Sequence, residues 1–207
     1  YPEKDTTIWS KPTAGGQYPN TGKDEILEIR SYPDDDGIGR SSRILIKFRD
    51  RDLNSALRTK VSGPYSASIH LYLGYATEIP KSFTLNAHPI SQSWDNGLGK
   101  LDDSPVNLTG VSWKYRTAGE NDTWDSLGCD YTTGVYDSSK TFDLISDLDL
   151  DLDITSFVDA VSSGSINNHG TVIKLQDSLE YETTSSIKLQ YFGVDTNTVF
   201  PPYLEFK

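Results

Sequence analysis

The alternating stretch DLDLDLDI, residues 147–154, carries the residue types in this chain that could most directly do chemistry. Four aspartates at every second position could hold Ca²⁺, because calcium prefers carboxylate oxygens. An EF-hand loop also needs a glycine at position six and a glutamate at position twelve. Counted from Asp147, those positions hold Leu152 and Val158, and a count from Asp149 fails in the same way. The stretch therefore lacks the glycine and the closing carboxylate of a calcium loop.

A β-strand explains the same stretch better. Alternation of period two sends the four apolar residues to one face and the aspartates to the other. A metal shared between this row and a neighbouring strand stays open as the alternative, because a ladder of bare carboxylates repels itself. We predict no cofactor, and no complete ligand set indicates a structural calcium.

The segment that follows, DITSFVDAVSSG, predicts one short helix near 154–162. Asp153 or Thr155 can cap its start, and Gly164 can end it. Its apolar residues share one helical stripe: Ile154, Phe157, Val158 and Val161. No other segment predicts a helix convincingly.

The elements that must position these residues are β-strands. Short apolar runs with turn-rich segments between them indicate a sandwich or a barrel. We predict an all-β fold: a single antiparallel, jelly-roll-like β-sandwich with one short helix, forming one domain over residues 1–207. The runs are EILEIR, SRILIKF, SIHLYLGY, FTLNAHPI, VSWKYR, TVIKL, SIKLQYF and YLEFK. The loops 94–110 and 116–140 are long for a minimal sandwich, and loops of that size usually have a function.

Two of these runs carry specific expectations. SIHLYLGY should place Ile69, Leu71, Leu73 and Tyr75 on one face of one strand. VSWKYR should form a strand with Trp113 and Tyr115 pointing into the core.

Charge and motif content exclude several functions. The chain has 19 basic and 30 acidic residues and a formal net charge of −11, which argues against nucleic acid and against an anionic membrane surface. Its single cysteine, Cys129, is more simply a small packed residue than a catalytic thiol. The three histidines are scattered, and no catalytic or metal motif is complete. We therefore expect a protein that is not an enzyme; a hydrolase would need a cleft with converging carboxylates.

The two long loops hold the candidate interface or ligand residues: Trp94, Asp102, Asp103, Trp124 and Tyr131. A flat tryptophan ring in a loop can stack on a sugar or on a partner protein. The competing interpretation, which we favour for Trp94 and Trp124, is that their rings plug the ends of the sandwich.

Taken in order, several segments resemble the DNRLRE-type β-sandwich domain, which is similar to carbohydrate-binding modules and occurs in secreted surface proteins. The most telling pieces are SRILIKF, the strand-to-helix block LDITSFVDAV and the terminal PPYLEF. SQSWDNGLGKLDDSP, GVSWKYR and the following Trp124 resemble a branch of virion structural proteins of tailed phages, especially contractile-tailed phages of marine bacteria. One departure is that Gly193, Val194 and Asp195 stand where the family commonly carries Ser-Arg-Glu.

This resemblance implies a tail, neck or capsid-surface fibre or decoration protein. Its expected partners are other virion proteins, copies of itself and a host-surface glycan, with neither nucleic acid nor membrane. The location that the resemblance implies for this chain is the virion. The alternative is a carbohydrate-binding module of a secreted or cell-surface protein, and the family supplies no catalytic residues to carry over.

Overall fold

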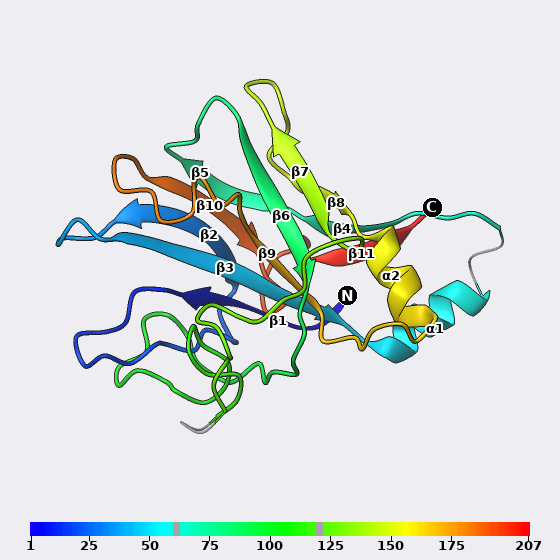
Figure 1. Ribbon diagram of the computed structural model, residues 1–207, viewed down its shortest axis with the longest axis horizontal. Coiled ribbons are helices and arrows are strands. Elements are labelled where there is room, and N and C mark those ends of the chain that lie inside the picture. The colour runs from blue at the N-terminus through cyan, green and yellow to red at the C-terminus, as the bar shows by residue number, and fades with distance from the viewer. Residues whose placement is uncertain (60–62, 119–121) are drawn as a thin grey trace.

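Most of the alternating runs form one large, curled antiparallel sheet in the computed structural model (Figure 1). The structure describes residues 1–59, 63–118 and 122–207, so that residues 119–121 of the predicted 116–140 loop lie outside the described residues. The sheet runs β5-β10-β2-β3-β9-β6-β7, and β1 also pairs with β3. Its strands are β1 (Pro2–Trp9), β2 (Ile26–Pro33), β3 (Gly39–Phe48), β5 (Leu73–Thr77), β6 (Phe83–Pro89), β7 (Ser138–Phe142), β9 (Thr171–Leu175) and β10 (Ile187–Phe192).

A second, three-stranded sheet packs against the first. It consists of β4 (Ala67–Leu71), β8 (Leu150–Asp153) and β11 (Tyr203–Phe206) in the order β11-β4-β8, and its pairs are antiparallel. Leu150 and Leu152 are buried while Asp151 and Asp153 are exposed, so the strand predicted from DLDLDLDI is confirmed for these four residues. The architecture is therefore the predicted all-β sandwich.

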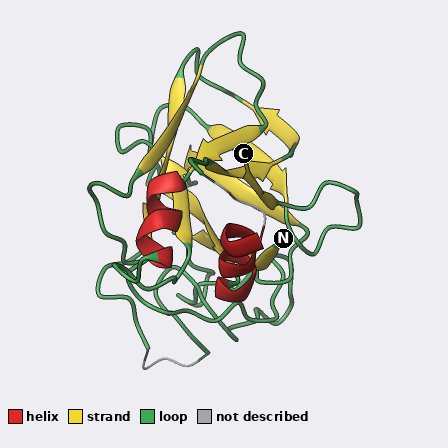
Figure 2. Cartoon of the chain, turned by 90° about the vertical axis from the view of Figure 1, so that its right-hand side faces the viewer, coloured by secondary structure: helices red, strands yellow, loops and turns green. Residues whose placement is uncertain are grey.

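The main hydrophobic core lies between the two sheets and is closed at one end by two helices, α1 (Asp50–Thr59) and α2 (Thr155–Ser162) (Figure 2). Leu53 of α1 and Phe157 and Val158 of α2 are buried in this core. The prediction of α2 is confirmed. Asp153 Oδ1 accepts the Thr155 N–H at 2.8 Å before its first turn, and Gly164, with φ +76°, follows its last turn.

Helix α1 was not predicted, which corrects the expectation of a single helix. Its sequence, DRDLNSALRT, is mostly polar, and Leu53 is its only buried residue. Asp50 and Asp52 lie in the first turn and Arg58 in the last, which is the arrangement that suits the helix dipole. The strand β7 was not predicted either, because SSKTF buries only Phe142.

Two predicted strands are wrong in detail. SIHLYLGY is divided at Tyr72: β4 belongs to the small sheet, whereas β5 joins the edge of the large sheet and leaves Tyr75 exposed. VSWKYR forms no strand, although Val111 and Trp113 are buried. Tyr115 is half-buried and belongs to neither hydrophobic cluster, so the expectation that it points into the core is wrong. The packing of these apolar side chains was predictable, but the backbone that carries them is irregular.

A second hydrophobic cluster lies on the opposite face of the large sheet. Successive side chains of β3 point alternately into the main core and into this second cluster. Ile44 and Ile46 face the main core, and Leu45 faces the second cluster. We call this second cluster the outer cluster; its members are Ile8, Leu45, Ile90, Trp94, Val111, Trp113, Trp124, Cys129 and Val172. Its outer wall is formed by residues 91–118 and 122–137, which we call the loop layer and which lie below β1 in Figure 1.

Candidate functional site

The loop layer buries the two tryptophans that the sequence offered as candidate contact residues. Trp94 is 1% exposed and Trp124 is 4% exposed. The Trp94 Nε1–H donates to the His169 carbonyl at 2.8 Å, and the Trp124 Nε1–H donates to the Ser112 carbonyl at 3.0 Å. Their burial agrees with the interpretation favoured from the sequence, and neither ring is exposed for contact with a ligand or partner. They instead fix the loop layer to the sheet, close to the competing interpretation that they fill the sandwich.

The other three candidate residues lie in two separate places. Asp102 is exposed, and Asp103 is half-buried, with its Oδ2 accepting the Lys100 N–H at 2.9 Å. Tyr131 is half-buried against the outer cluster, and its ring stacks on His88 with 4.7 Å between centroids. Within the described part of the chain, no hydrogen bond or ring contact joins the two aspartates to Tyr131.

A buried ion network beneath the loop layer was missed by the sequence prediction. Arg43 of β3 donates through Nε and Nη2 to Glu180 at 2.7 and 3.0 Å, and through Nη1 to the Gly128 carbonyl at 2.6 Å. Lys174 of β9 lies 2.9 Å from the same carboxylate. Burial alone would lower the pKa of Lys174, but Asp177 and Glu180 hold it above its ordinary value. The sequence did contain a signal for such a network, because Arg43 in SRILIKF and Lys174 in TVIKL are cations within apolar strands. A buried cation needs a paired carboxylate.

The same region places a histidine beside an aspartate without completing a catalytic arrangement. His88 Nδ1 lies 2.8 Å from Asp137 Oδ1. In the described residues, no hydroxyl or thiol hydrogen-bonds to His88 in the manner of a nucleophile. Cys129 is fully buried, and burial raises the pKa of its thiol well above the usual value, so its reactive thiolate form is disfavoured.

The aspartates of the opening stretch serve the fold. Asp149 Oδ1 accepts the Leu73 N–H at 2.7 Å, and Asp147 Oδ1 accepts the Asp149 N–H at 3.1 Å. Asp151 Oδ1 lies 3.8 Å from His70 Nε2. Across residues 1–59, 63–118 and 122–207, no group of three His, Cys, Asp or Glu side chains is placed to hold a metal ion.

The N-terminal loop, residues 10–25 between β1 and β2, is pinned to the loop layer by Asn20. The fully buried Asn20 side chain donates to the carbonyls of Asn96 and Val111 at 2.7 and 2.8 Å and accepts the Gly99 N–H at 2.9 Å. Gly97 has φ +81°, and a Cβ there would lie 1.9 Å from the Thr109 carbonyl oxygen. GLGKLD is therefore a tight turn against Asn20, as its glycines indicated.

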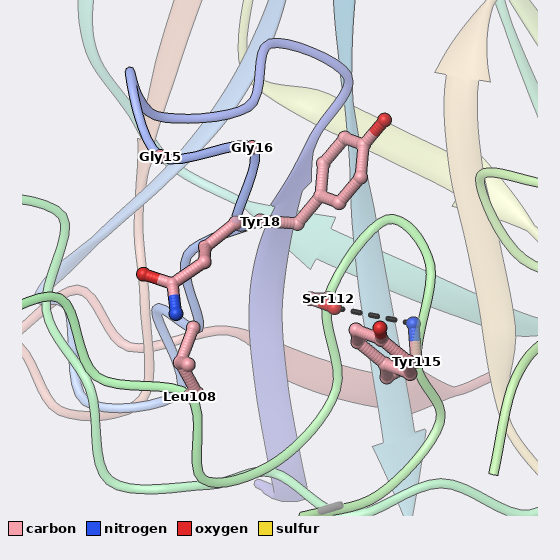
Figure 3. Close-up of a pocket in the computed structure, with 7 residues that line it drawn as sticks. Gly15, Gly16, Tyr18, Leu108, Ser112 and Tyr115 are labelled. Atoms are coloured by element: carbon pink, nitrogen blue, oxygen red, sulfur yellow. Dashed lines mark hydrogen bonds between the residues drawn. The ribbon is translucent and has the colours of Figure 1, made fainter. Parts of the chain in front are cut away.

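Between these two loops lies a cavity of about 300 Å³ (Figure 3). Tyr18 enters it from the N-terminal loop, and Leu108, Ser112 and Tyr115 come from the loop layer. The Tyr115 N–H donates to Ser112 Oγ at 3.2 Å. Two phenol rings, the Gln17 amide and exposed glycine backbone surround this space, a mixture that suits a small polar ligand with one apolar face. No sequence motif marked this cavity, because PTAGGQYPNTG was predicted only as a turn.

The loop layer also carries exposed apolar side chains. They are Leu98, Leu101, Leu108, Leu127 and Val135. All five lie in the long loops 94–110 and 116–140 that the sequence singled out, although none was named as a candidate residue.

Neither α1 nor α2, the helices of the described residues, is long and apolar enough to cross a membrane. No protein-family model matches the chain, and no curated protein matches it.

Proposed function

We propose that this chain is a non-catalytic structural component of a tailed-phage virion, acting in assembly and in contact with the host surface. A tail, neck or capsid-surface fibre or decoration protein fits the proposal, with other virion proteins and further copies of this chain as its partners. The sequence resemblance supports the phage assignment. The structural observation that supports contact is the set of exposed apolar side chains in the loop layer.

Exposed apolar residues scattered singly over a surface are ordinary. Five within one layer that packs against the large sheet are better evidence for a contact surface than five scattered ones. Its tryptophans are buried in the outer cluster, and Arg43 binds the Gly128 carbonyl within it. A surface ordered before binding loses less conformational entropy when a partner docks. The loop layer therefore has the properties expected of a pre-organised contact surface.

The test is incorporation into particles. In a phage whose own copy of this chain is replaced, we expect the double variant Leu98→Ser and Leu127→Ser to fold but to be depleted from purified virions. The matched control is Leu144→Ser with Ile145→Ser, because those side chains are 77% and 92% exposed but lie between β7 and β8. Quantitative mass spectrometry of purified particles provides the measurement. A chain that is absent from virions and found only as free secreted protein contradicts the proposal.

The cavity of Tyr18 and Tyr115 favours a second candidate, a carbohydrate-binding module. Phenol rings stack on the apolar face of a sugar, and amide and backbone groups bind its hydroxyls. In that case, the isolated monomeric domain should bind a neutral glycan, and Tyr115→Ala should abolish that binding without lowering the melting temperature. A domain that binds no neutral glycan in a broad glycan screen contradicts this second candidate.

A further inference from the structure

The strand β11 has one edge that no other described strand covers. It pairs with β4 on one side, and in the part of the chain that the structure describes no strand pairs with its other side (Figure 1). The reciprocal hydrogen bonds between Lys207 and Ser66 set the phase of this ladder. Residues of an antiparallel pair alternate between hydrogen-bonded and non-hydrogen-bonded positions. Leu204 and Phe206 therefore direct their backbone N–H and C=O groups away from β4, towards the open edge.

The hydrogen bonds of β4 agree with this phase. Ala67 is the residue of β4 that lies opposite Phe206. It donates its N–H to Thr155 Oγ1 at 2.9 Å and accepts the Ile154 N–H at 2.8 Å. Its backbone groups thus point away from β11. The outward groups of Leu204 and Phe206 are therefore placed to bind a further strand, which is the mode of recognition called β-augmentation.

The edges of β5, β7 and β8 are covered or interrupted, unlike that of β11. In β5, Asp149 Oδ1 accepts the Leu73 N–H at 2.7 Å, and the pairing of β5 with β10 contains a register shift. β7 and β8 lie beside each other, and Ser138 Oγ of β7 donates to the Asp153 carbonyl of β8. Bulges and covering groups of this kind are how proteins prevent unwanted edge pairing.

The side chains of β11 suit a second copy of the same strand. Leu204 and Phe206 are half-buried and pack against the main core, so they lie on the inner face. Glu205 and Lys207 alternate with them on the outer face, where Lys207 Nζ lies 3.0 Å from Glu205 Oε2. Charged side chains on an edge discourage pairing with most strands. Here the two charges have opposite signs, so an antiparallel copy brings a lysine near each glutamate.

We propose that β11 pairs with β11 of a second copy of this chain in an antiparallel dimer. With Glu205 on the two-fold axis, Leu204 of each copy lies opposite the partner's Phe206. The outward backbone groups of these two residues then hydrogen-bond across the axis, and the two small sheets join into one continuous sheet. Their half-buried side chains also meet on the inner face, which removes further apolar surface from water.

Electrostatics on the outer face make this pairing selective. The two Glu205 carboxylates lie opposite each other, which is unfavourable for like charges. The partner's Lys207 is the diagonal neighbour of Glu205, and a long side chain reaches that position. A short strand edge is smaller than a standard interface, which buries about 800 Å² per partner. The dimer should therefore form at high protein concentration and dissociate on dilution.

This inference goes beyond the virion proposal, because the isolated domain tests it and the loop layer takes no part in it. Sedimentation velocity over a dilution series measures the association. We expect the wild-type protein to pass from dimer to monomer as it is diluted. Hydrogen exchange of the Leu204 and Phe206 amides should slow as the dimer forms, because those amides gain acceptors across the axis.

Charge variants identify the strand that forms the contact. Glu205→Lys leaves only lysines at these positions, and Lys207→Glu leaves only glutamates, so each variant alone should dimerise about tenfold more weakly or worse. Both side chains are partly exposed, so the variants should fold, and their melting temperatures check this. An equimolar mixture of the two variants should form a heterodimer, because its cross-strand charges are opposite in sign.

The matched control is Lys81→Glu, which makes the same charge change at an exposed lysine between β5 and β6 and should dimerise like wild type. A wild-type protein that stays monomeric at its highest soluble concentration would overturn the proposal. So would a dimer that neither charge variant weakens, since the contact would then lie on another surface. If the Leu204 and Phe206 amides become protected only when a different purified virion protein is added, the edge binds a foreign strand and not a second copy.

Discussion

At the scale of single residues, Asp5 has the lowest exposed fraction of the acidic residues that the structure describes. It is 2% exposed in β1, and its Oδ2 accepts the Val194 N–H at 2.8 Å. Burial raises the pKa of Asp5 to about 7; the Val194 N–H opposes this shift and the nearby Asp195 adds to it. The folded protein therefore holds the proton more tightly than the unfolded chain does between about pH 4 and pH 7.

Because the folded pKa is raised, this carboxyl favours the folded state less as pH rises towards and above 7. We expect Asp5→Asn, which keeps an acceptor for Val194, to gain about 2–3 kcal/mol relative to wild type on going from about pH 5 to pH 8. Urea unfolding at both pH values measures this. Parallel pH profiles for the two proteins would show that Asp5 is ionised without penalty.

The two faces of β8 give a second residue-scale prediction. Leu150→Ala should lower the free energy of unfolding by about 2–5 kcal/mol, because it leaves a cavity in the main core. Asp151→Asn, on the exposed face of the same strand, should change it by less than about 0.5 kcal/mol. Chemical denaturation compares the two. Similar losses would mean that the aspartate face carries a stabilising contact, and a calcium-dependent loss for Asp151→Asn would restore the metal hypothesis.

At the scale of elements, Glu180 connects β3, β9 and the loop layer. Its carboxylate pairs with both Arg43 and Lys174, and Arg43 in turn binds the Gly128 carbonyl. Glu180→Gln would leave two buried cations without their shared partner, so we expect a loss of about 3–5 kcal/mol. Amide exchange should rise first in the segment 122–137, because that part loses its anchor to β3.

The control is Glu182→Gln, two residues further along, where the carboxylate is partly exposed and accepts from Thr183 and Thr184 N–H groups. It should leave both stability and exchange nearly unchanged. If Glu180→Gln destabilises the protein but exchange rises first in β11 or α2, the network stabilises the sandwich and not the loop layer.

Elements with strong alternation were predictable from the sequence, and elements built on few apolar residues were not. The faces of β6 and β8 follow from period-two patterns that bury one side only. By contrast, α1 buries only Leu53, and the division at Tyr72 depends on which sheet each half of the run pairs with. A local sequence pattern does not determine which distant strands pair with each other. For the same reason, the sequence favoured burial of Trp94 and Trp124 but could not show that they pack on the outer face of the large sheet and not at the ends of the sandwich.

At the scale of the whole molecule, both ends of the chain are held by strands from elsewhere. β1 pairs with β3 and β11 pairs with β4, with reciprocal backbone hydrogen bonds between Lys207 and Ser66 at 2.9 and 3.0 Å. We expect limited proteolysis to nick exposed loops, such as the one carrying Leu144 and Ile145, without releasing a stable half. Gel filtration of the nicked protein gives the measurement. A folded fragment of about half the length would show two independent domains.

The two hydrophobic clusters on opposite faces of one sheet give the protein separate optical reporters. Trp94, Trp113 and Trp124 lie in the outer cluster, and the main core contains no tryptophan among its described residues. The fourth tryptophan, Trp9, lies in β1, so intrinsic fluorescence reports mainly on the loop layer, whereas far-ultraviolet circular dichroism is dominated by the paired strands. If the loop layer loosens before the sandwich unfolds, the emission will shift to the red at a lower denaturant concentration than the one at which ellipticity is lost. A ligand that tightens the loop layer would narrow that gap, so the difference between two spectroscopic midpoints becomes a label-free assay for binding.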